Sequence, residues 1–173
     1  MKKMKFSENQ IVNILKEAEA GVSLEELVRQ HGFSKASFYY KWKAKYSGMS
    51  ASDLKRLKEL GKQLGVITAT SRRSFEHDLE LHKIPKDLLD YTQTEDDTSF
   101  HKPDPKVFEL VLVWLKKQNL RPEAVLYIGD GLHDMKAALG AGFNFLGVQT
   151  GLISADEFNA AKAKSIKDLH ELL

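Results

Sequence analysis

The sequence of 173 residues has no cysteine, only four prolines and no long apolar run. Without cysteine, disulfide bonds, thiolate metal ligands and cysteine nucleophiles are excluded, and the composition fits a reducing cytosol. We therefore expect a cytoplasmic protein. The longest apolar runs are about as long as a β-strand, so we expect neither a membrane span nor a secretory signal. Hydrophobic residues make up 42% and charged residues 29% of the chain, which is ordinary for a globular protein.

A strong overall charge is also absent, since the net charge is only +2. The two parts of the chain nevertheless carry net charges of opposite sign. Residues 1–60 hold 12 Lys and Arg against 7 Asp and Glu, whereas residues 61–173 hold 14 against 17. The first part is therefore basic and the second mildly acidic, which predicts that the two parts meet different partners.

Serine residues at three positions of the basic part have the pattern of helix N-caps. Ser7 with Gln10 and Ser23 with Glu26 form capping boxes, and Ser34 is a third cap. These caps predict three short helices over residues 8–20, 24–31 and 35–46. Gly32, between the second and third helices, is expected to adopt the left-handed conformation of a tight helix-turn-helix connection.

The third of these helices has one aromatic face and one basic face. Phe38, Trp42 and Tyr46 recur every four residues, so we expect them to lie in a core. The remaining surface has the residues that a recognition helix presents to the DNA major groove. The candidate DNA-binding residues are Lys35, Ser37, Tyr40, Lys41 and Lys43. The alternative is that these lysines simply solvate an exposed helix face.

The first part of the chain closely resembles the helix-turn-helix of small insertion-sequence transposase proteins, which are encoded by the first reading frame. The stretch that carries this resemblance is K-M-K-F-S-E-N-Q-I-V-N-I-L-K-E-A-E-A-G-V-S-L-E-E-L-V-R-Q-H-G-F-S-K-A-S-F-Y-Y-K-W-K-A-K-Y. The resemblance covers about residues 1–60. It implies that this part binds double-stranded DNA at the terminal inverted repeats of an element. It also implies self-association, because in that family a leucine zipper follows.

The zipper is interrupted in this chain. Leu57, Leu60 and Leu64 form a helical stripe, but Gly61 and Gly65 break it within too few heptads for a convincing coiled coil. Self-association is therefore left open. We predict a helix-turn-helix domain over residues 1–50, a junction helix over 51–62 and an α/β domain over 63–173.

Strand and helix patterns alternate from residue 63 to the end. Strands are predicted at 63–68, 88–93, 125–129 and 144–148, and helices at 73–82, 105–119, 133–140, 154–162 and, as a short one, 166–172. Such alternation indicates a parallel sheet of about four strands with helices on both faces. The fold class is therefore α/β, a truncated Rossmann-like sheet behind a three-helix domain.

Asp130 ends a predicted strand and Asp134 follows four residues later at the start of a helix. Two carboxylates so placed can converge on Mg²⁺, which prefers few carboxylates and phosphate oxygens. The alternative is a pair of solvated loop acids. Thr68, at the end of another strand, and Lys102, before Pro103, supply a hydroxyl donor and a cation suited to a phosphoryl group.

The series G-V-I-T, H-K-P-D-P and G-D-G-L-H-D resembles the motifs of the haloacid dehalogenase superfamily of phosphohydrolases. The resemblance covers about residues 57–173. It implies that Thr68 and Lys102 bind phosphate and that Asp130 and Asp134 bind Mg²⁺. The family nucleophile, the first Asp of a D-x-D-x-T motif after the first strand, is missing, since no D-x-D precedes Thr68. We therefore expect no catalytic residue, weak Mg²⁺ binding, negligible phosphatase activity and no small phosphorylated substrate.

The missing first strand belongs, by the same resemblance, between the strands that end at Thr68 and Asp130. The sheet then closes directly across the gap, accepts a strand from another chain, or keeps a marginal core. Three functions stay open: a DNA-binding protein with an inactive hydrolase-like domain, a Mg²⁺-dependent phosphatase with a helix-turn-helix appendage, and a gene-fusion product without a selected function.

Overall fold

The computed structural model describes residues 6, 10, 13, 14, 17, 22–34, 51–151 and 153–172. The chain divides into two compact units, Met1–Gly48 and Met49–Leu173, and each is described by itself. No helix among the described residues is both long and apolar enough to cross a membrane.

The first unit contains helix α2 (Leu24–His31), which confirms the helix predicted there. Ser23 caps its start by accepting a hydrogen bond from the Glu26 N–H at 3.3 Å, and Gly32 ends it with a left-handed φ of 66°. The predicted capping box is wrong in its second hydrogen bond, the one from the Ser23 N–H to the Glu26 side chain. The Glu26 carboxylate bonds to Arg29 and Gln30 within α2, because a guanidinium fork is a stronger donor than one backbone N–H.

Apolar side chains close this unit around Ile14, Leu27 and Phe33. Phe6 packs edge-on against Phe33, with ring centroids 6.5 Å apart. Of the first predicted helix, the described residues Gln10, Asn13, Ile14 and Glu17 are helical. The third predicted helix, with all the candidate DNA-binding residues (Lys35, Ser37, Tyr40, Lys41 and Lys43), lies outside the described residues.

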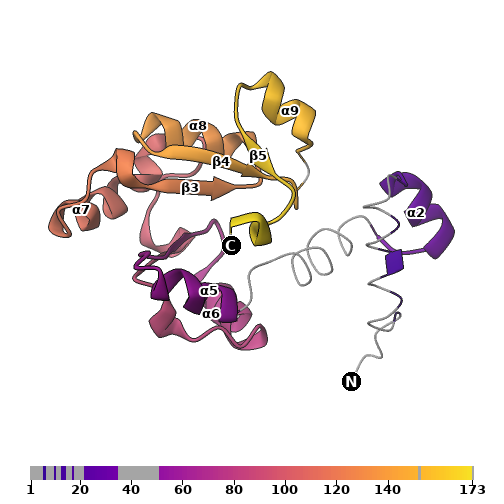
Figure 1. Cartoon of the computed structure of the whole chain (residues 1–173), viewed down its shortest axis with the longest axis horizontal. Coiled ribbons are helices and arrows are strands. Elements are labelled where there is room, and N and C mark those ends of the chain that lie inside the picture. Colours follow the sequence, from indigo (N-terminus) through magenta and orange to yellow (C-terminus); the bar gives the residue numbers. More distant parts are fainter. Residues whose placement is uncertain are drawn as a thin grey trace. The chain divides into compact units, whose positions relative to one another are not determined.

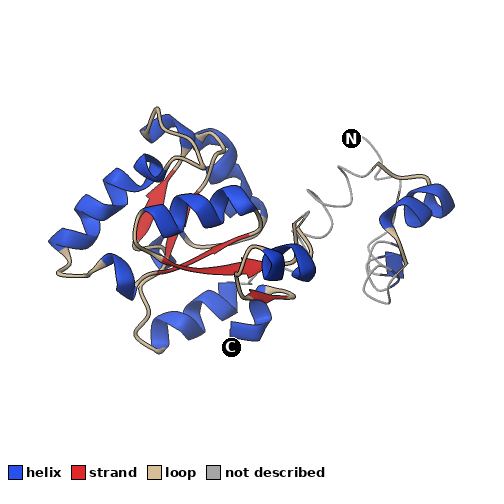
Figure 2. Cartoon of the chain, turned by 90° about the horizontal axis from the view of Figure 1, so that it is seen from above, coloured by secondary structure: helices blue, strands red, loops and turns tan. Residues whose placement is uncertain are grey.

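The second unit alternates strands and helices, as its sequence pattern predicts (Figures 1 and 2). Its strands are β1 (Gly65–Ile67), β2 (Tyr91–Gln93), β3 (Leu126–Gly129), β4 (Asn144–Val148) and β5 (Ser165–Ile166). Its α-helices are α5 (Ala51–Glu59), α6 (Arg72–Leu81), α7 (Glu109–Lys117), α8 (Leu132–Gly140) and α9 (Ala155–Ala160). Its 3₁₀ helices are η2 (Lys86–Leu88), η3 (Glu95–Asp97), η4 (Pro105–Phe108), η5 (Pro122–Ala124) and η6 (Leu169–Leu172).

The strands form two parallel sheets, one of β1 and β2 and one of β3, β4 and β5, and not a single sheet of about four strands. Direct closure across the gap is therefore wrong, because β1 and β3 share no ladder. No strand lies between them among the described residues. The α/β class and the parallel pairing are confirmed.

An apolar layer from η4 and α7 covers one face of both sheets. Phe108 of η4 packs against Tyr127 of β3 with ring centroids 5.0 Å apart. Trp114 of α7 packs against Tyr91 of β2 at 5.3 Å. Phe108 is fully buried and also contacts Phe143 at 5.1 Å. This aromatic layer holds the two sheets together where backbone pairing does not.

Two predicted helices differ from the structure. The helix expected from residue 105 begins as the 3₁₀ turn η4, because the Asp104 side chain accepts from Lys106 N and Pro105 stands at the first position. The short helix expected at 166–172 is replaced by β5 and η6, because Ser165–Ile166 pairs with Gly147–Val148 at the edge of β4. That pairing is a tertiary contact that local periodicity does not encode.

Gly147 of β4 has no room for a side chain. A Cβ there would lie 2.8 Å from ring atoms of Phe158, a fully buried residue of α9. We predict that Gly147→Ala lowers the free energy of unfolding by about 1–3 kcal/mol, because the ring cannot move aside. Urea denaturation measures this loss. Gly65→Ala is the matched strand control, since its Cβ would meet Tyr91 at an ordinary 3.4 Å; equal losses for both variants would contradict the packing argument.

Candidate functional site

Lys102 connects the two sheets near the carboxyl ends of β1 and β3. Its ammonium donates to Asp134 Oδ1 at 2.7 Å and to the carbonyl of Ile67, the last residue of β1, at 3.4 Å. The side chains of Lys102 and Asp134 are only 17% and 13% exposed. Burial lowers the pKa of Lys102, but the oxygens of Tyr127 and Asp134 outweigh it, and the net pKa is raised. Lys102 is therefore a charged, well-held cation at neutral pH.

Asp134 is fixed by the start of α8 as well as by Lys102. Its Oδ2 accepts a hydrogen bond from the N–H of Gly131, the N-cap residue, at 3.2 Å. Gly129, the last residue of β3, leaves the space that this carboxylate fills, since a Cβ there would lie 2.5 Å from Asp134 Cβ. The glycines of the G-D-G-L-H-D motif thus allow the Asp134 side chain to turn back beside the strand.

Asp130 follows β3 directly and lies more exposed than Asp134. Burial of part of its carboxyl group and the negative charge of Asp134 raise the pKa of Asp130. Gly151 leaves the room for this side chain, because a Cβ there would come within 2.6 Å of Asp130 Cβ and Oδ2. The structure therefore brings Asp130 and Asp134 close enough for their charges to interact.

Tyr127 of β3 is a site residue that sequence reasoning missed. Its hydroxyl lies 3.4 Å from the Ile67 carbonyl and 3.5 Å from Asp134 Oδ1. The Lys102 ammonium stands over its ring, 5.3 Å from the centroid. Burial raises the pKa of Tyr127, so the phenol stays neutral. In the sequence, Tyr127 lies within an apolar strand pattern, and no local pattern indicates that it belongs to a site.

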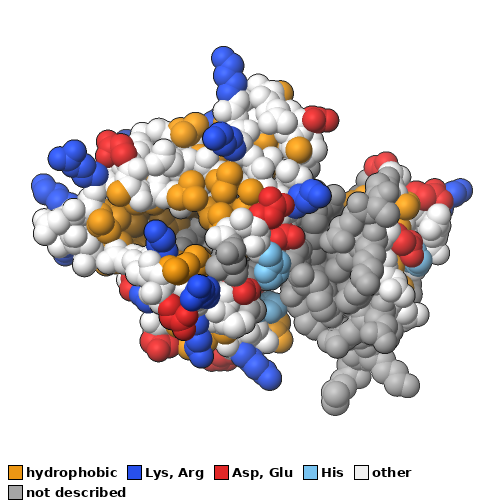
Figure 3. Space-filling model, in the orientation of Figure 1, with side chains coloured by type: hydrophobic (Ala, Val, Ile, Leu, Met, Phe, Trp, Pro, Cys, Tyr) orange, Lys and Arg blue, Asp and Glu red, His pale blue; other side chains and the backbone are white. Residues whose placement is uncertain are grey.

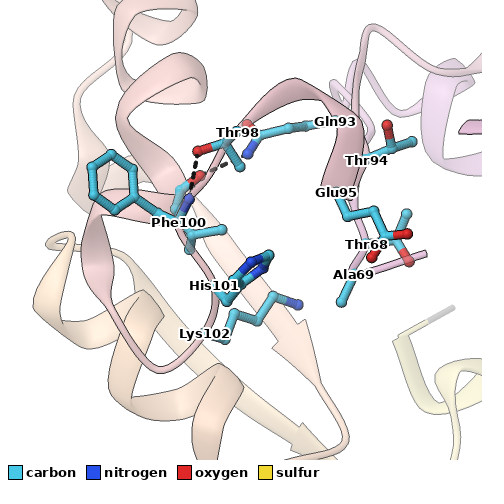
Figure 4. A pocket seen from close by; sticks show the side chains of 10 residues that line it. Thr68, Ala69, Gln93, Thr94, Glu95, Thr98, Phe100, His101 and Lys102 are labelled. Carbon is cyan, nitrogen blue, oxygen red and sulfur yellow. Dashed lines mark hydrogen bonds between the residues drawn. The ribbon is translucent and has the colours of Figure 1, made fainter. Parts of the chain in front are cut away.

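Thr68 lines a hollow together with Glu95, His101 and Lys102. Figure 4 shows Thr68 and Glu95 on one side of this hollow and His101 and Lys102 on the other. The hollow is small, with a cavity volume of about 20 Å³. The Thr68 hydroxyl is within 3.1 Å of the Thr70 hydroxyl and accepts from the Thr70 N–H at 3.2 Å.

The acidic cluster after β2 has a structural role. Asp97 accepts from both the N–H and the hydroxyl of Thr94, at 2.7 and 3.0 Å, and pairs with Arg72. Asp96 accepts from the Arg72 N–H at 2.7 Å at the start of α6. These contacts hold η3 against α6. Asp96 and Asp97 are thus both engaged with other residues of the protein.

Asp130 and Asp134 fit a divalent cation only in part. Their mutual repulsion would be relieved by a cation, as the raised pKa of Asp130 indicates. Both oxygens of Asp134, however, already accept hydrogen bonds from Lys102 and Gly131. Among the described residues, no group of three or more His, Asp or Glu side chains is placed to hold a metal.

The chain is similar to two different kinds of known protein. Residues of the first third are 57% identical over 58 residues to an uncharacterised 10.0 kDa protein of insertion element IS407 of Burkholderia multivorans, covering 34% of this chain and 66% of that protein. The pyrophosphatase PpaX of Bacillus mycoides is 29% identical over 115 residues, covering 66% of this chain and 52% of that protein. The chain thus spans less than two thirds of the length of these curated relatives.

Solved structures resemble the fold across nearly the whole chain. A protein described as a haloacid dehalogenase-like hydrolase from Bacteroides fragilis superposes with a TM-score of 0.61 at 25% identity, covering 94% of this chain and 89% of that one. A HAD-superfamily hydrolase from Ehrlichia chaffeensis gives 0.56 at 17% identity, covering 98% and 86%. The family model described as haloacid dehalogenase-like hydrolase matches residues 2–148. The chain therefore belongs to the haloacid dehalogenase-like hydrolases, with an N-terminal part that is similar to insertion-element proteins.

Proposed function

We propose that the protein binds double-stranded DNA through its N-terminal unit and carries a hydrolase-like domain without appreciable turnover. The observation that carries the first half is the helix and turn at Ser23–Gly32, followed at once by a basic segment. The helix is capped at both ends and packs on Ile14 and Phe33. The 57% identity to an insertion-element protein supports the same function.

In this proposal Lys35, Ser37, Tyr40, Lys41 and Lys43 contact the DNA. Lys35 and Lys43 reach phosphates, which contribute affinity without sequence preference, and the residues between them face the base edges. The net positive charge of residues 1–60 favours such contacts. Self-association of the chain is a further part of the proposal, because DNA-binding proteins of this kind commonly act as multimers.

The proposed inactivity of the second unit rests on which groups the site contains. Lys102 and Thr68 are suited to hold phosphoryl oxygens and Asp130 and Asp134 to hold a weakly bound Mg²⁺, which would neutralise phosphate charge. No D-x-D motif precedes Thr68, so the sequence has no counterpart of the family's nucleophile motif. Loss of a covalent nucleophile removes the reaction path itself, whereas loss of one stabilising donor costs about 10²–10³ in rate.

A Mg²⁺-dependent phosphohydrolase is the second candidate function. The 29% identity to PpaX and the proximity of Asp130, Asp134 and Lys102 favour it. It would require water to attack a metal-bound phosphate directly.

The DNA-binding proposal predicts a salt-dependent affinity that involves Lys41. Fluorescence anisotropy with a labelled duplex, measured from about 50 to 200 mM salt, should show log K falling linearly with log salt concentration. Lys41→Ala should bind more weakly throughout or flatten this slope by about one unit, because one cation is lost.

Lys117→Ala is the charge-matched control, since Lys117 is exposed on α7 in the second unit. Its affinity should equal that of the unchanged chain. Absence of binding at about 50 mM salt, or an equal loss for both variants, would refute DNA binding by the N-terminal unit.

The inactivity proposal predicts no Mg²⁺-dependent hydrolysis of p-nitrophenyl phosphate above the level of an Asp130→Asn preparation. Activity that survives this substitution comes from a contaminating enzyme, because the substitution removes a proposed metal ligand. Activity that the substitution abolishes would overturn the proposal in favour of the phosphohydrolase.

The Lys102–Asp134 ion pair predicts how weak the Mg²⁺ site is. At 10 mM, Mg²⁺ should raise the Tm of the unchanged chain by less than about 1 °C but that of Lys102→Met by about 3 °C, because the substitution frees Asp134 for the cation. Thermal unfolding with and without Mg²⁺ measures the difference. Lys136→Met, an exposed position on α8, is the control; a shift there as large as in Lys102→Met would show that only net charge matters.

A further inference from the structure

A second hollow lies at the C-terminal end of α7 and shares no lining residue with the one beside Thr68. Its cavity volume is about 440 Å³, and clefts that bind ligands have volumes of about 300–1,000 Å³. The end of α7 and the segment that leads into η5 form its walls. We call it the α7 hollow. Its lining residues are Leu112, Lys116, Asn119, Leu120, Arg121 and Pro122.

The floor of the α7 hollow consists of three apolar residues, Leu112, Leu120 and Pro122, which are half-buried. Leu112 and Leu120 pack against the apolar core of the second unit, so the fold holds them in place. The rim consists of the three polar residues, which are all exposed. Because none of the lining residues is fully buried, the hollow is open. A segment of a larger molecule can therefore enter it with one or two side chains.

The cations of the rim are not needed to end α7. Lysines in the last turn of a helix often bond its free carbonyl groups. Here backbone N–H groups do so, because Asn119 adopts a left-handed φ of 56°. The Leu120 N–H donates to the Leu115 carbonyl at 2.9 Å, and the Asn119 N–H donates to the next carbonyl at 3.1 Å. The side chains of Lys116 and Arg121 form no ion pair or hydrogen bond with any residue that the structure describes, so both can serve a ligand.

The charge around the α7 hollow is opposite to that of the unit as a whole. Residues 112–124 hold three Lys and Arg against one Glu, whereas residues 61–173 hold 14 Lys and Arg against 17 Asp and Glu. Figure 3 shows Lys and Arg side chains, in blue, projecting at the end of this unit where Figure 1 labels α7. At 0.1 M salt, charges act over about 10 Å, so a small group in the hollow meets the local positive charge. The surface is therefore complementary to an acidic partner.

We propose that the α7 hollow binds a short acidic segment of another protein, in which an apolar side chain stands next to one or two carboxylates. The apolar side chain rests on the floor and removes its half-buried residues from water. The carboxylates pair with Lys116 and Arg121 on the rim. The guanidinium of Arg121 can hold a carboxylate through two parallel N–H donors, which fixes its orientation as well as its position.

Nucleic acid is the other polyanion that a basic surface attracts, and the α7 hollow suits it less well. Proteins hold single-stranded bases by stacking them on aromatic rings, and the lining of the hollow has none. A nucleic acid also carries charge far beyond the hollow, where it meets the acidic remainder of the unit. A peptide with two carboxylates avoids that repulsion.

Fluorescence anisotropy of the full chain with a fluorescein-labelled peptide, Gly-Asp-Leu-Glu-Leu-Gly amide, tests the proposal. Saturable binding with a Kd of about 100 μM is expected, and it should weaken as salt rises from about 50 to 300 mM. A peptide with Asn and Gln in place of Asp and Glu should bind at least about fivefold more weakly. A peptide with Ser in place of both Leu residues should lose a similar factor, because it leaves the floor uncovered.

Two neighbouring lysines of α7 provide a matched pair of protein variants. Lys116→Gln should weaken peptide binding about threefold, and so should Arg121→Gln. Lys117→Gln should leave binding unchanged, since Lys117 is exposed on the same turn but does not line the hollow. All three positions are exposed, so the fold should be kept, and thermal unfolding checks this.

The proposal is overturned if the parent peptide does not bind at about 1 mM, if the Asn and Gln peptide binds as well, or if Lys116→Gln and Lys117→Gln lose affinity equally. Two further results would assign the hollow to another occupant. A labelled DNA duplex that binds Lys116→Gln more weakly than Lys117→Gln would show that nucleic acid occupies it. A dimer in sedimentation velocity that only Lys116→Gln dissociates would show that a second copy of the chain does.

Discussion

The contact between the Lys102 ammonium and the Asp134 carboxylate is the interaction on which the site depends. A cation that is 17% exposed needs a close anion, and Asp134 supplies one at 2.7 Å. The carboxylate can stand there because Gly129 has no side chain and because the Gly131 N–H fixes its second oxygen. The same ammonium reaches the end of β1, so one charge joins two sheets that share no ladder.

Membership of the family does not by itself establish that this chain performs the family's reaction. The chain belongs to the haloacid dehalogenase-like hydrolases, but both oxygens of Asp134 accept hydrogen bonds from Lys102 and Gly131 of the protein itself. Asp96 and Asp97, which follow β2, contact Arg72 and Thr94 and so hold η3 against α6. The fold alone therefore does not establish the reaction.

Local signals in the sequence were sufficient to predict much of the fold. Ser23 and Gly32 fixed α2 at both ends, because capping and a left-handed turn involve only neighbouring residues. Apolar runs located β1 to β4, and the spacing of Asp130 and Asp134 placed both carboxylates at the end of β3. The role of Tyr127, the strand β5 and the division into two sheets could not be predicted, because each depends on a partner distant in sequence.

The aromatic layer of η4 and α7 packs against both sheets of the second unit. Apart from the polar contacts around Lys102, the two sheets share one apolar core, in which the η4–α7 segment packs Phe108 against Tyr127 and Trp114 against Tyr91. Cooperative unfolding requires that the parts of a domain lose their structure together, and such coupling is only as strong as the contacts shared between them. The η4–α7 segment contacts both sheets, and it therefore couples the unfolding of β1–β2 to that of β3–β5.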